Sequence, residues 1–222
     1  MNFLGLGLYT PAQAASITRT PIREVRRWLF GYKTSQGKFS PPLWTAQYDA
    51  SEEKVLGFRD LMELRIVKAF AAHGVPIRVI RAAIDSSREL FRTAYPFTSN
   101  RFLTDGKSIF YEAVKSDGEL TDLVKRQLVF EHIIRPNLYA GIHFDSRGAA
   151  LRWHPVKNND VIVLDPEISF GRPILSMHGI PTEIVAQAMQ AEGDKKSVAA
   201  QFDITVAEVN AAVKYESQLL AA

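Results

Sequence analysis

The residues that could do chemistry are few in this sequence and lie far apart. His143, Asp145 and His154 fall on two neighbouring runs of alternating apolar and polar residues, where they could hold a metal ion. A site of this kind also needs a fourth ligand, and none is apparent in this stretch. An exposed strand face normally carries such residues, so we expect no metal site.

The acidic pairs and the candidate nucleophile lack the surroundings that catalysis requires. Glu52-Glu53 and Asp165-x-Glu167 lie in turns, where they more readily cap helices or face solvent. Gly5-x-Gly7 is not followed by the helix of a phosphate-binding loop, and Ser176 and His178 lie outside any nucleophile elbow. The chain has no cysteine. We therefore expect no catalytic residue, no cofactor and no enzymatic activity.

The basic residues of the first 48 positions form the clearest functional pattern. The whole chain carries a net charge of +3, whereas residues 1–48 carry +5 and the remainder carries −2. Such an asymmetry is expected where one end of a protein meets a polyanion. We expect six residues to contact double-stranded DNA, the two lysines on phosphate groups: Arg19, Arg23, Arg26, Arg27, Lys33 and Lys38.

Two short helices must position the arginines. Thr10 and Thr20 each precede a proline, a pattern that predicts two helix starts with a threonine cap. The first helix is rich in alanine, so a second helix can cross it closely, as in a helix-turn-helix. In the second helix, Ile22, Val25 and Leu29 recur at helical spacing and are expected to face inward. The arginines then point largely outward.

The segment that follows predicts a wing and two longer helices. Gly31 is expected to end the second helix, and residues 33–48 combine glycine, paired prolines and aromatics, which favours a short β-hairpin. An amphipathic helix is predicted from about 58 to 72, and a further helix from 75 to about 91. The first of them has five expected core positions: Phe58, Leu61, Met62, Ile66 and Phe70.

Residues 97–164 are predicted to be rich in β-structure around one helical segment near 120–139. Two alternating runs within 142–154 flank a Ser-Arg-Gly turn, a pattern that predicts a hairpin. Residues 161–164 predict a short buried strand. Pairing about the hairpin turn would place four apolar residues on its core-facing side: Ile142, Phe144, Leu151 and Trp153.

Three further helices are predicted at the end of the chain, over 181–191, 194–202 and 205–220. The tight junction at Asp203-Ile204 gives the last two the spacing of a second helix-turn-helix. The last helix lacks a cationic face, so we expect it to serve dimerisation or a protein partner rather than DNA.

The composition limits the class of protein. No stretch approaches the roughly 20 apolar residues of a membrane helix, and the apolar opening of the chain is too short for a signal peptide. The lack of cysteine suits a reducing compartment. We therefore expect a soluble, cytoplasmic protein that makes no membrane contact.

The N-terminal pattern resembles the MerR-type winged-helix family. Four motifs carry the likeness in order: Tyr9-Thr10, the helix from Thr20 to Trp28, Phe58 to Leu61, and His73 to Ile80. The resemblance implies a winged helix-turn-helix that binds DNA. The chain lacks the long C-terminal helix and the effector cysteines of the metal-sensing members.

The C-terminal part resembles a small helical domain of VapB-like antitoxins in type II toxin-antitoxin pairs. Three segments carry this likeness: VIVLDPEISFGRP at 161–173, Gly-Ile-Pro-Thr at 179–182, and the closing helix at 206–216. The resemblance implies a toxin partner, commonly a PIN-like ribonuclease.

Together these patterns predict an α+β, mostly helical protein. A winged helix-turn-helix domain is expected over 1–96, a β-rich linking segment over 97–160, and a helical antitoxin-associated domain, a three-helix unit, over 161–222. The expected function is an antitoxin that neutralises a PIN-like ribonuclease toxin and represses its own operon. A homodimer is expected because winged helices gain operator affinity from paired half-sites.

Two alternatives stay open. The chain could be a stand-alone transcription regulator with a small-molecule effector, whose mark would be a ligand-sized cavity. It could also be a protein-interaction module whose basic face meets an acidic partner.

Overall fold

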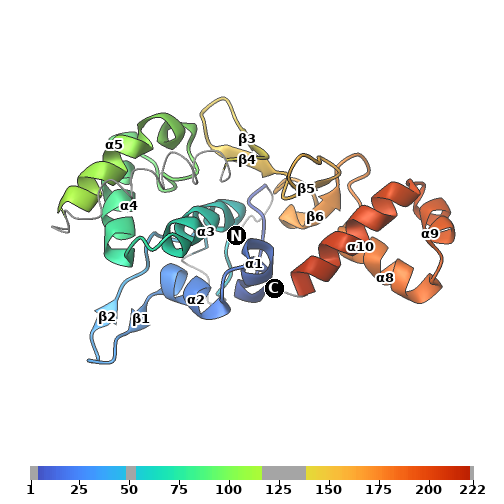
Figure 1. Cartoon of the computed structure of the whole chain (residues 1–222), viewed down its shortest axis with the longest axis horizontal. Coiled ribbons are helices and arrows are strands. Elements are labelled where there is room, and N and C mark those ends of the chain that lie inside the picture. Colours follow the sequence, from blue (N-terminus) through green and yellow to red (C-terminus); the bar gives the residue numbers. More distant parts are fainter. Residues whose placement is uncertain (1–4, 49–53, 117–138, 221–222) are drawn as a thin grey trace.

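The computed structural model describes residues 5–48, 54–116 and 139–220 (Figure 1). Its helices are α1 (Pro11–Thr18), α2 (Ile22–Phe30), α3 (Phe58–Ala72), α4 (Ile77–Phe91), α5 (Asn100–Ser116), α8 (Thr182–Glu192), α9 (Lys195–Phe202) and α10 (Val206–Leu220). One antiparallel sheet pairs β1 (Tyr32–Lys33) with β2 (Phe39–Ser40), and a second has the order β3 (Ile142–Phe144), β4 (Ala150–Trp153), β5 (Ile162–Leu164) and β6 (Pro173–Leu175). The expected combination of helices and small sheets is confirmed.

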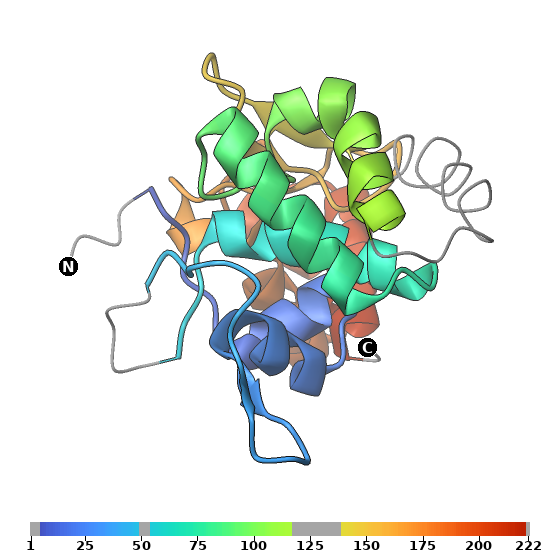
Figure 2. The same cartoon turned by 90° about the vertical axis from the view of Figure 1, so that its left-hand side faces the viewer.

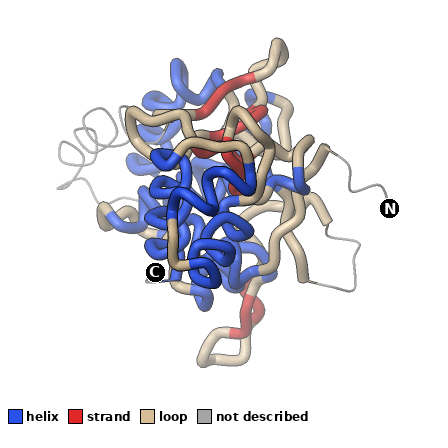
Figure 3. The backbone as a smooth tube through the Cα atoms, turned by 90° about the vertical axis from the view of Figure 1, so that its right-hand side faces the viewer, coloured by secondary structure: helices blue, strands red, loops and turns tan. Residues whose placement is uncertain are grey.

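The elements form an elongated arrangement. Helices α1 to α5 occupy one end, the four-stranded sheet lies in the middle, and α8 to α10 occupy the other end (Figure 1). The β1–β2 hairpin projects from the body in views from two opposite sides (Figure 2 and Figure 3). Within the described ranges, no helix combines the length and the apolar character needed to cross a membrane.

Helix α1 begins with the capping pattern that the sequence predicts. The Thr10 hydroxyl accepts a hydrogen bond from the Gln13 backbone N–H (3.2 Å), and the Gln13 side chain accepts one from the Thr10 N–H (2.9 Å). This reciprocal pair satisfies two donors at the helix start. The prediction for Thr20 is wrong, because Pro21 precedes α2 and Thr20 instead accepts a hydrogen bond from the Thr18 hydroxyl (2.8 Å) in a buried turn.

Helix α2 packs one narrow face inward. Its buried residues are Val25, Trp28 and Leu29, a stripe with helical spacing. Ile22 was expected to be buried but is 40% exposed. It is the first residue of the helix, and the buried stripe begins one turn later. Gly31 ends the helix, as predicted, with φ +72°.

Helix α3 lies at the centre of the larger core. All five predicted core positions are buried. The expectation of an amphipathic helix is wrong, however, because neighbours cover α3 on most sides, with α1 and α4 both in contact with it. It therefore buries four further residues, two of them acidic: Asp60, Glu63, Leu64 and Val67.

The buried carboxylate of Asp60 joins α3 to the preceding loop. It accepts hydrogen bonds from the Trp44 indole (2.9 Å), the Gln47 N–H (3.0 Å) and the Gly57 N–H (2.9 Å). A buried carboxylate is tolerated only when such donors replace its lost hydration. Asp60 thus fixes the path of the chain between β2 and α3.

Glu63, one turn further along α3, has fewer hydrogen-bond partners for its carboxyl group. Its Oε1 accepts hydrogen bonds from the Thr98 N–H (3.0 Å) and hydroxyl (3.1 Å), whereas its buried Oε2 has no hydrogen-bond partner. The pKa of Glu63 is raised to about 8, mainly by burial and to a smaller extent by the nearby Asp60, against the lowering effect of the Thr98 hydrogen bonds. Glu63 is therefore mainly protonated near neutral pH.

Helix α5 corrects the expectation of β-structure after residue 97. Phe97 and Phe102 pack on Phe70 of α3, with ring centroids 5.4 and 6.5 Å from it. Gly106 weakens the helical pattern, but a Cβ there would lie only 2.8 Å from the Phe102 ring, so close packing explains the glycine. The helix expected near 120–139 lies almost wholly outside the described residues.

The predicted β3–β4 hairpin is confirmed, with one correction to its faces. Ile142 pairs with Trp153, but an irregularity after His143 places Ala150 opposite Phe144. A bulge of this kind shifts every later residue to the other face. Ala150 is therefore buried, and Leu151, expected to face the core, is exposed.

The last part of the chain packs around its own apolar cluster. The helices predicted over 181–191, 194–202 and 205–220 are present as α8, α9 and α10. They share a core with β6, formed by Leu175, Val185, Val198, Ala199, Ile204, Val209 and Ala212. Strand β5, a buried strand as predicted, pairs with β4, so the predicted boundary at residue 160 falls between two strands of one sheet.

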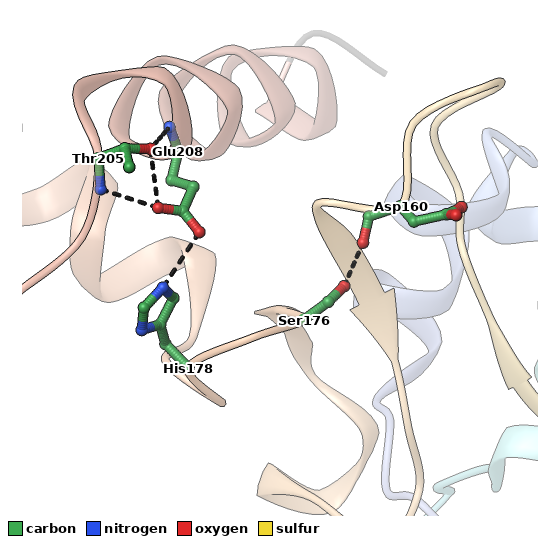
Figure 4. Close-up of polar contacts among 5 residues, drawn as sticks. All are labelled: Asp160, Ser176, His178, Thr205 and Glu208. Carbon is green, nitrogen blue, oxygen red and sulfur yellow. Dashed lines mark hydrogen bonds and ion pairs between the residues drawn. The ribbon is translucent and has the colours of Figure 1, made fainter.

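Polar contacts order the turns of this part (Figure 4). The Thr205 N–H and hydroxyl each donate to Glu208 at 2.8 Å, which caps α10. The other Glu208 oxygen contacts His178 at 3.1 Å. Thr205 and His178 thereby hold the pKa of Glu208 below its usual range. Ser176 donates to the carbonyl of Asp160, which ties the end of β6 to the start of β5.

The first described residues bond to the segment between β5 and β6. The Tyr9 hydroxyl donates to the Gly171 carbonyl at 2.6 Å, and the Leu8 N–H donates to the Phe170 carbonyl at 2.9 Å. A Cβ at Gly171 would lie 2.3 Å from the Tyr9 oxygen. Glycine is therefore required at this contact.

The elevated pKa of Glu63 predicts a pH-dependent stability. A carboxyl with a higher pKa in the folded protein loses its proton at a lower pH in the unfolded chain than in the folded one. Between about pH 4.5 and 8 the folded protein therefore binds more protons, so the free energy of unfolding falls as pH rises. Across pH 5 to 8 the fall is at most ~4 kcal/mol. Glu63→Gln should remove it, as measured by urea unfolding. Equal slopes in the wild type and the variant would contradict the prediction.

Candidate nucleic-acid interface

The predicted DNA-contacting residues lie mostly on α2 and the adjoining hairpin. Arg23 and Arg26 are exposed on α2, and the Arg23 side chain is 81% accessible. Lys33 lies in β1 and Lys38 directly before β2, both exposed. The hairpin follows α2 immediately and projects beside it (Figure 2). These four cations therefore belong to one helix-and-hairpin unit.

Arg27 is partly engaged within this unit. Its guanidinium lies 3.4 Å from Glu24 and stacks over the Tyr32 ring at 4.0 Å from the centroid. The hydrogen bond that Arg27 donates to the Tyr32 oxygen, more than the charge of Glu24, raises the pKa of Arg27, and the same bond lowers the pKa of the Tyr32 phenol. Arg27 thus joins the end of α2 to β1 as well as adding charge.

Arg19 lies apart from this unit. It follows α1 in the left-handed conformation (φ 53°), and its guanidinium donates to the Gln218 side chain of α10 at 3.4 Å. The structure therefore brings Arg19 to the C-terminal helix, whereas the sequence analysis grouped it with the α2 arginines.

Arg81 is a positioning residue that the sequence analysis missed. Its guanidinium donates to the carbonyls of Pro42 (2.7 Å) and Pro41 (2.8 Å), just after β2. The Leu43 N–H donates to the Trp28 carbonyl at 2.8 Å. These bonds fix the base of the hairpin on α4 and α2. Arg81 is one of several arginines on α4, so nothing in the sequence sets it apart.

The charge of the unit suits a polyanion. Glu24 is the one acidic residue in the segment from 5 to 48 that the structure describes, and both Arg23 (3.7 Å) and Arg27 contact it. Arg26 and the two lysines have no such neighbour within the described residues. Exposed arginine and lysine side chains on a helix and an adjacent hairpin can contact phosphate groups and base edges together.

The described ranges give little support to a metal site or to a catalytic triad. No group of three histidine or acidic residues there could hold a metal ion. The His143 and His154 rings lie 5.1 Å apart, and burial, Arg152 and His154 lower the pKa of His143. Ser176, His178 and Asp165 do not form a hydrogen-bonded triad, because Ser176 donates to a backbone carbonyl and His178 contacts Glu208.

Comparison with known proteins gives two likenesses in sequence. Residues 162–215 match a family described as "Protein of unknown function (DUF433)". The chain is also 26% identical over 215 residues to a Mycobacterium tuberculosis (strain ATCC 25618 / H37Rv) protein named "Putative antitoxin VapB45", and the alignment covers 89% of each chain. The DUF433 match spans β5, β6 and most of the three C-terminal helices.

A solved structure shares the fold. The crystal structure of Rv2018 from Mycobacterium tuberculosis matches with a TM-score of 0.72 at 22% sequence identity, covering 96% of this chain and 99% of that one. The likeness therefore extends over the whole architecture, including the N-terminal helices, the sheet and the C-terminal helices.

Gly31, at the junction between α2 and the hairpin, has no room for a side chain. A Cβ at Gly31 would lie 2.6 Å from the Phe39 ring and from the Ser40 carbonyl, and its φ is +72°. Gly31→Ala should lower the free energy of unfolding, measured in urea, by ~2–4 kcal/mol.

Gly37, in the hairpin turn, is the matched control. Its φ is +76°, but nothing lies within 4 Å of a Cβ there. Gly37→Ala should cost only the backbone strain of ~1–2 kcal/mol. If the two variants lose the same stability, the close contact between Gly31 and the hairpin is not a constraint.

Proposed function

We propose that the chain is an antitoxin that neutralises a PIN-like ribonuclease toxin and represses its own operon by binding DNA. The observation that carries the proposal is the likeness to the protein named as an antitoxin, which extends over 89% of both chains. The C-terminal sequence motifs and the exposed basic unit support it independently. The chain has no catalytic role in this proposal.

The DNA-binding arm is residues 1–96, acting as a winged helix-turn-helix. Helix α2 enters the major groove with Arg23 and Arg26, and the hairpin lies on the phosphate backbone with Lys33 and Lys38. Arg81 stabilises this geometry by holding the hairpin base. A homodimer would place two such units on paired half-sites. Arg19 contributes less to this surface because it contacts α10.

The toxin-binding arm is the C-terminal domain, residues 161–222, joined to the DNA-binding arm by 97–160. Met177, at the turn after β6, is 85% exposed. Ile168, also exposed, lies beside Gly179, and exposed Val206 follows the Thr205 cap that faces His178. Exposed apolar side chains gathered around one turn favour a protein partner. We assign this turn to the toxin.

A second function is a stand-alone regulator with a small-molecule effector. A hollow of about 360 Å³, lined by residues of α1, α3, β4 and α10, favours this function. Small-molecule sites have volumes from about 300 Å³ upward. The two functions differ in whether a toxin partner exists.

The DNA-binding arm predicts a specific loss of affinity. In band-shift titrations on the DNA upstream of its own gene, Arg23→Ala/Arg26→Ala should weaken binding at least about tenfold at moderate salt. It should also reduce the slope of log K against log salt by about 2, because two fewer cations displace counterions from the DNA.

The matched control is Arg147→Ala/Arg152→Ala, which removes two exposed arginines from the β3–β4 hairpin. This control should bind as the wild type does. Equal binding by both double variants, or no binding by the wild type at low salt, would contradict the DNA-binding proposal.

The toxin-binding arm predicts a loss of inhibition. The protein encoded beside this gene, if it is the toxin, should lose ribonuclease activity on mixing with the wild-type chain. Met177→Glu should raise the half-inhibitory concentration at least about tenfold, since it places a charge in an apolar contact. Leu90→Glu is the control, because Leu90 is a similarly exposed apolar residue on α4. Equal inhibition by both variants would exclude the Met177 turn from the contact.

A further inference from the structure

We propose that a hollow between α1, α3 and α10 binds a small organic anion through a carboxylate or phosphate group. The hollow has a volume of about 360 Å³ and is partly open to solvent. Arg65 of α3, Trp153 of β4 and Tyr215 of α10 contribute to its wall. Three elements that are distant in the sequence thus meet around one ligand-sized space.

All charged residues that line the hollow are cationic. Arg19, Arg65 and Lys157 line it, and none of its described lining residues is acidic. Arg65 has no acidic partner among the described residues. Cations that converge on a partly enclosed space attract anions strongly, because the surrounding protein focuses the field.

Two hydrogen-bond donors at the wall are left without partners. The Arg65 Nη1 and the Tyr215 hydroxyl are both buried, and neither makes a hydrogen bond. Burial lowers the pKa of Arg65 to about 10 and raises that of Tyr215, so the phenol keeps its proton. Unsatisfied buried donors are rare in proteins and destabilise the folded state. Both residues line the hollow, so we expect an oxyanion bound there to satisfy one or both of these donors.

The Arg65 guanidinium is also held in place by an aromatic ring. It stacks over the Trp153 ring at 4.1 Å from the centroid. A guanidinium held by its face keeps its N–H donors in the plane, where they match a carboxylate or phosphate in a bidentate manner. Ile17, Val156 and Leu219 add apolar wall, which suits the carbon skeleton of an organic anion.

The hollow is placed to influence DNA binding. Arg19 lines it and contacts Gln218 of α10, and Arg19 is also the residue that joins α1 to the turn before α2. A bound anion would engage Arg19 and so link α10 to the helix-turn-helix. This regulatory step rests on the proposed DNA binding, whereas anion binding itself does not.

Binding is tested with inorganic phosphate and with benzoate, each against sodium chloride at equal ionic strength. The readouts are the melting temperature and the tryptophan fluorescence, since Trp153 stacks on Arg65. One or both anions should raise the melting temperature of the full chain in a saturable manner below about 10 mM. A response to phosphate alone indicates a phosphate ligand, and a response to benzoate alone indicates a carboxylate ligand.

Two variants distinguish a binding role from a structural one. Arg65→Met replaces an unpaired buried cation by an apolar side chain, so without anion its melting temperature should equal or exceed that of the wild type. The anion-induced rise should disappear. Tyr215→Phe should keep the fold and weaken anion binding about tenfold. Arg147→Met, which changes an exposed arginine elsewhere, should respond as the wild type does.

Three outcomes would overturn the proposal. They are no response of the wild type to either anion, an unchanged response in Arg65→Met, and a lower melting temperature of Arg65→Met without anion. Arg23→Ala/Arg26→Ala should still bind the anion, which separates this test from the test of DNA binding. Loss of the anion response in that variant would place the anion on α2 instead of in the hollow.

Discussion

The structure depends on α3, a central helix that is covered on most sides and yet contains buried acidic residues. Asp60 can lie inside because the Trp44 indole and two backbone N–H groups surround its carboxylate. These bonds hold the loop before α3, while the apolar residues of α3 receive α1 and α4. Removing the carboxylate would leave three buried donors without an acceptor, so the same group that costs energy to bury also determines where its neighbours lie.

The same arrangement positions both candidate sites. Helix α4, packed on α3, supplies Arg81 to the base of the hairpin, and α2 reaches the hairpin through Gly31. On another side of α3, Arg65 reaches the hollow that α10 helps to close. The proposed polyanion surface and the proposed anion pocket therefore both depend on α3, which supports the first through α4 and contributes the Arg65 side chain to the second.

Local patterns predicted much of the fold, and long-range packing accounts for the errors. The Thr10 cap, the Gly31 stop and the bounds of α3 and α4 follow from neighbouring residues, which is why they could be predicted. The face of Leu151 depends on a bulge, and the burial of Glu63 depends on Thr98, 35 residues away. Among the basic residues, composition located the segment, but only the fold separates Arg19, which meets α10, from Arg23 and Arg26.

The contact between Tyr9 and Gly171 has a consequence for the order in which the chain can fold. A ribosome releases the N-terminal segment long before residue 171 is made, so Tyr9 must wait for its acceptor through most of synthesis. Contacts of such long separation slow folding and leave early segments exposed. The first residues also bond to the segment that leads into α3, where Tyr9 pairs with Leu56 and the Leu6 carbonyl accepts from the Phe58 N–H. They can therefore dock on the larger core while α1 to α5 assemble. Only their bonds to Phe170 and Gly171 must wait until the later part of the chain is made.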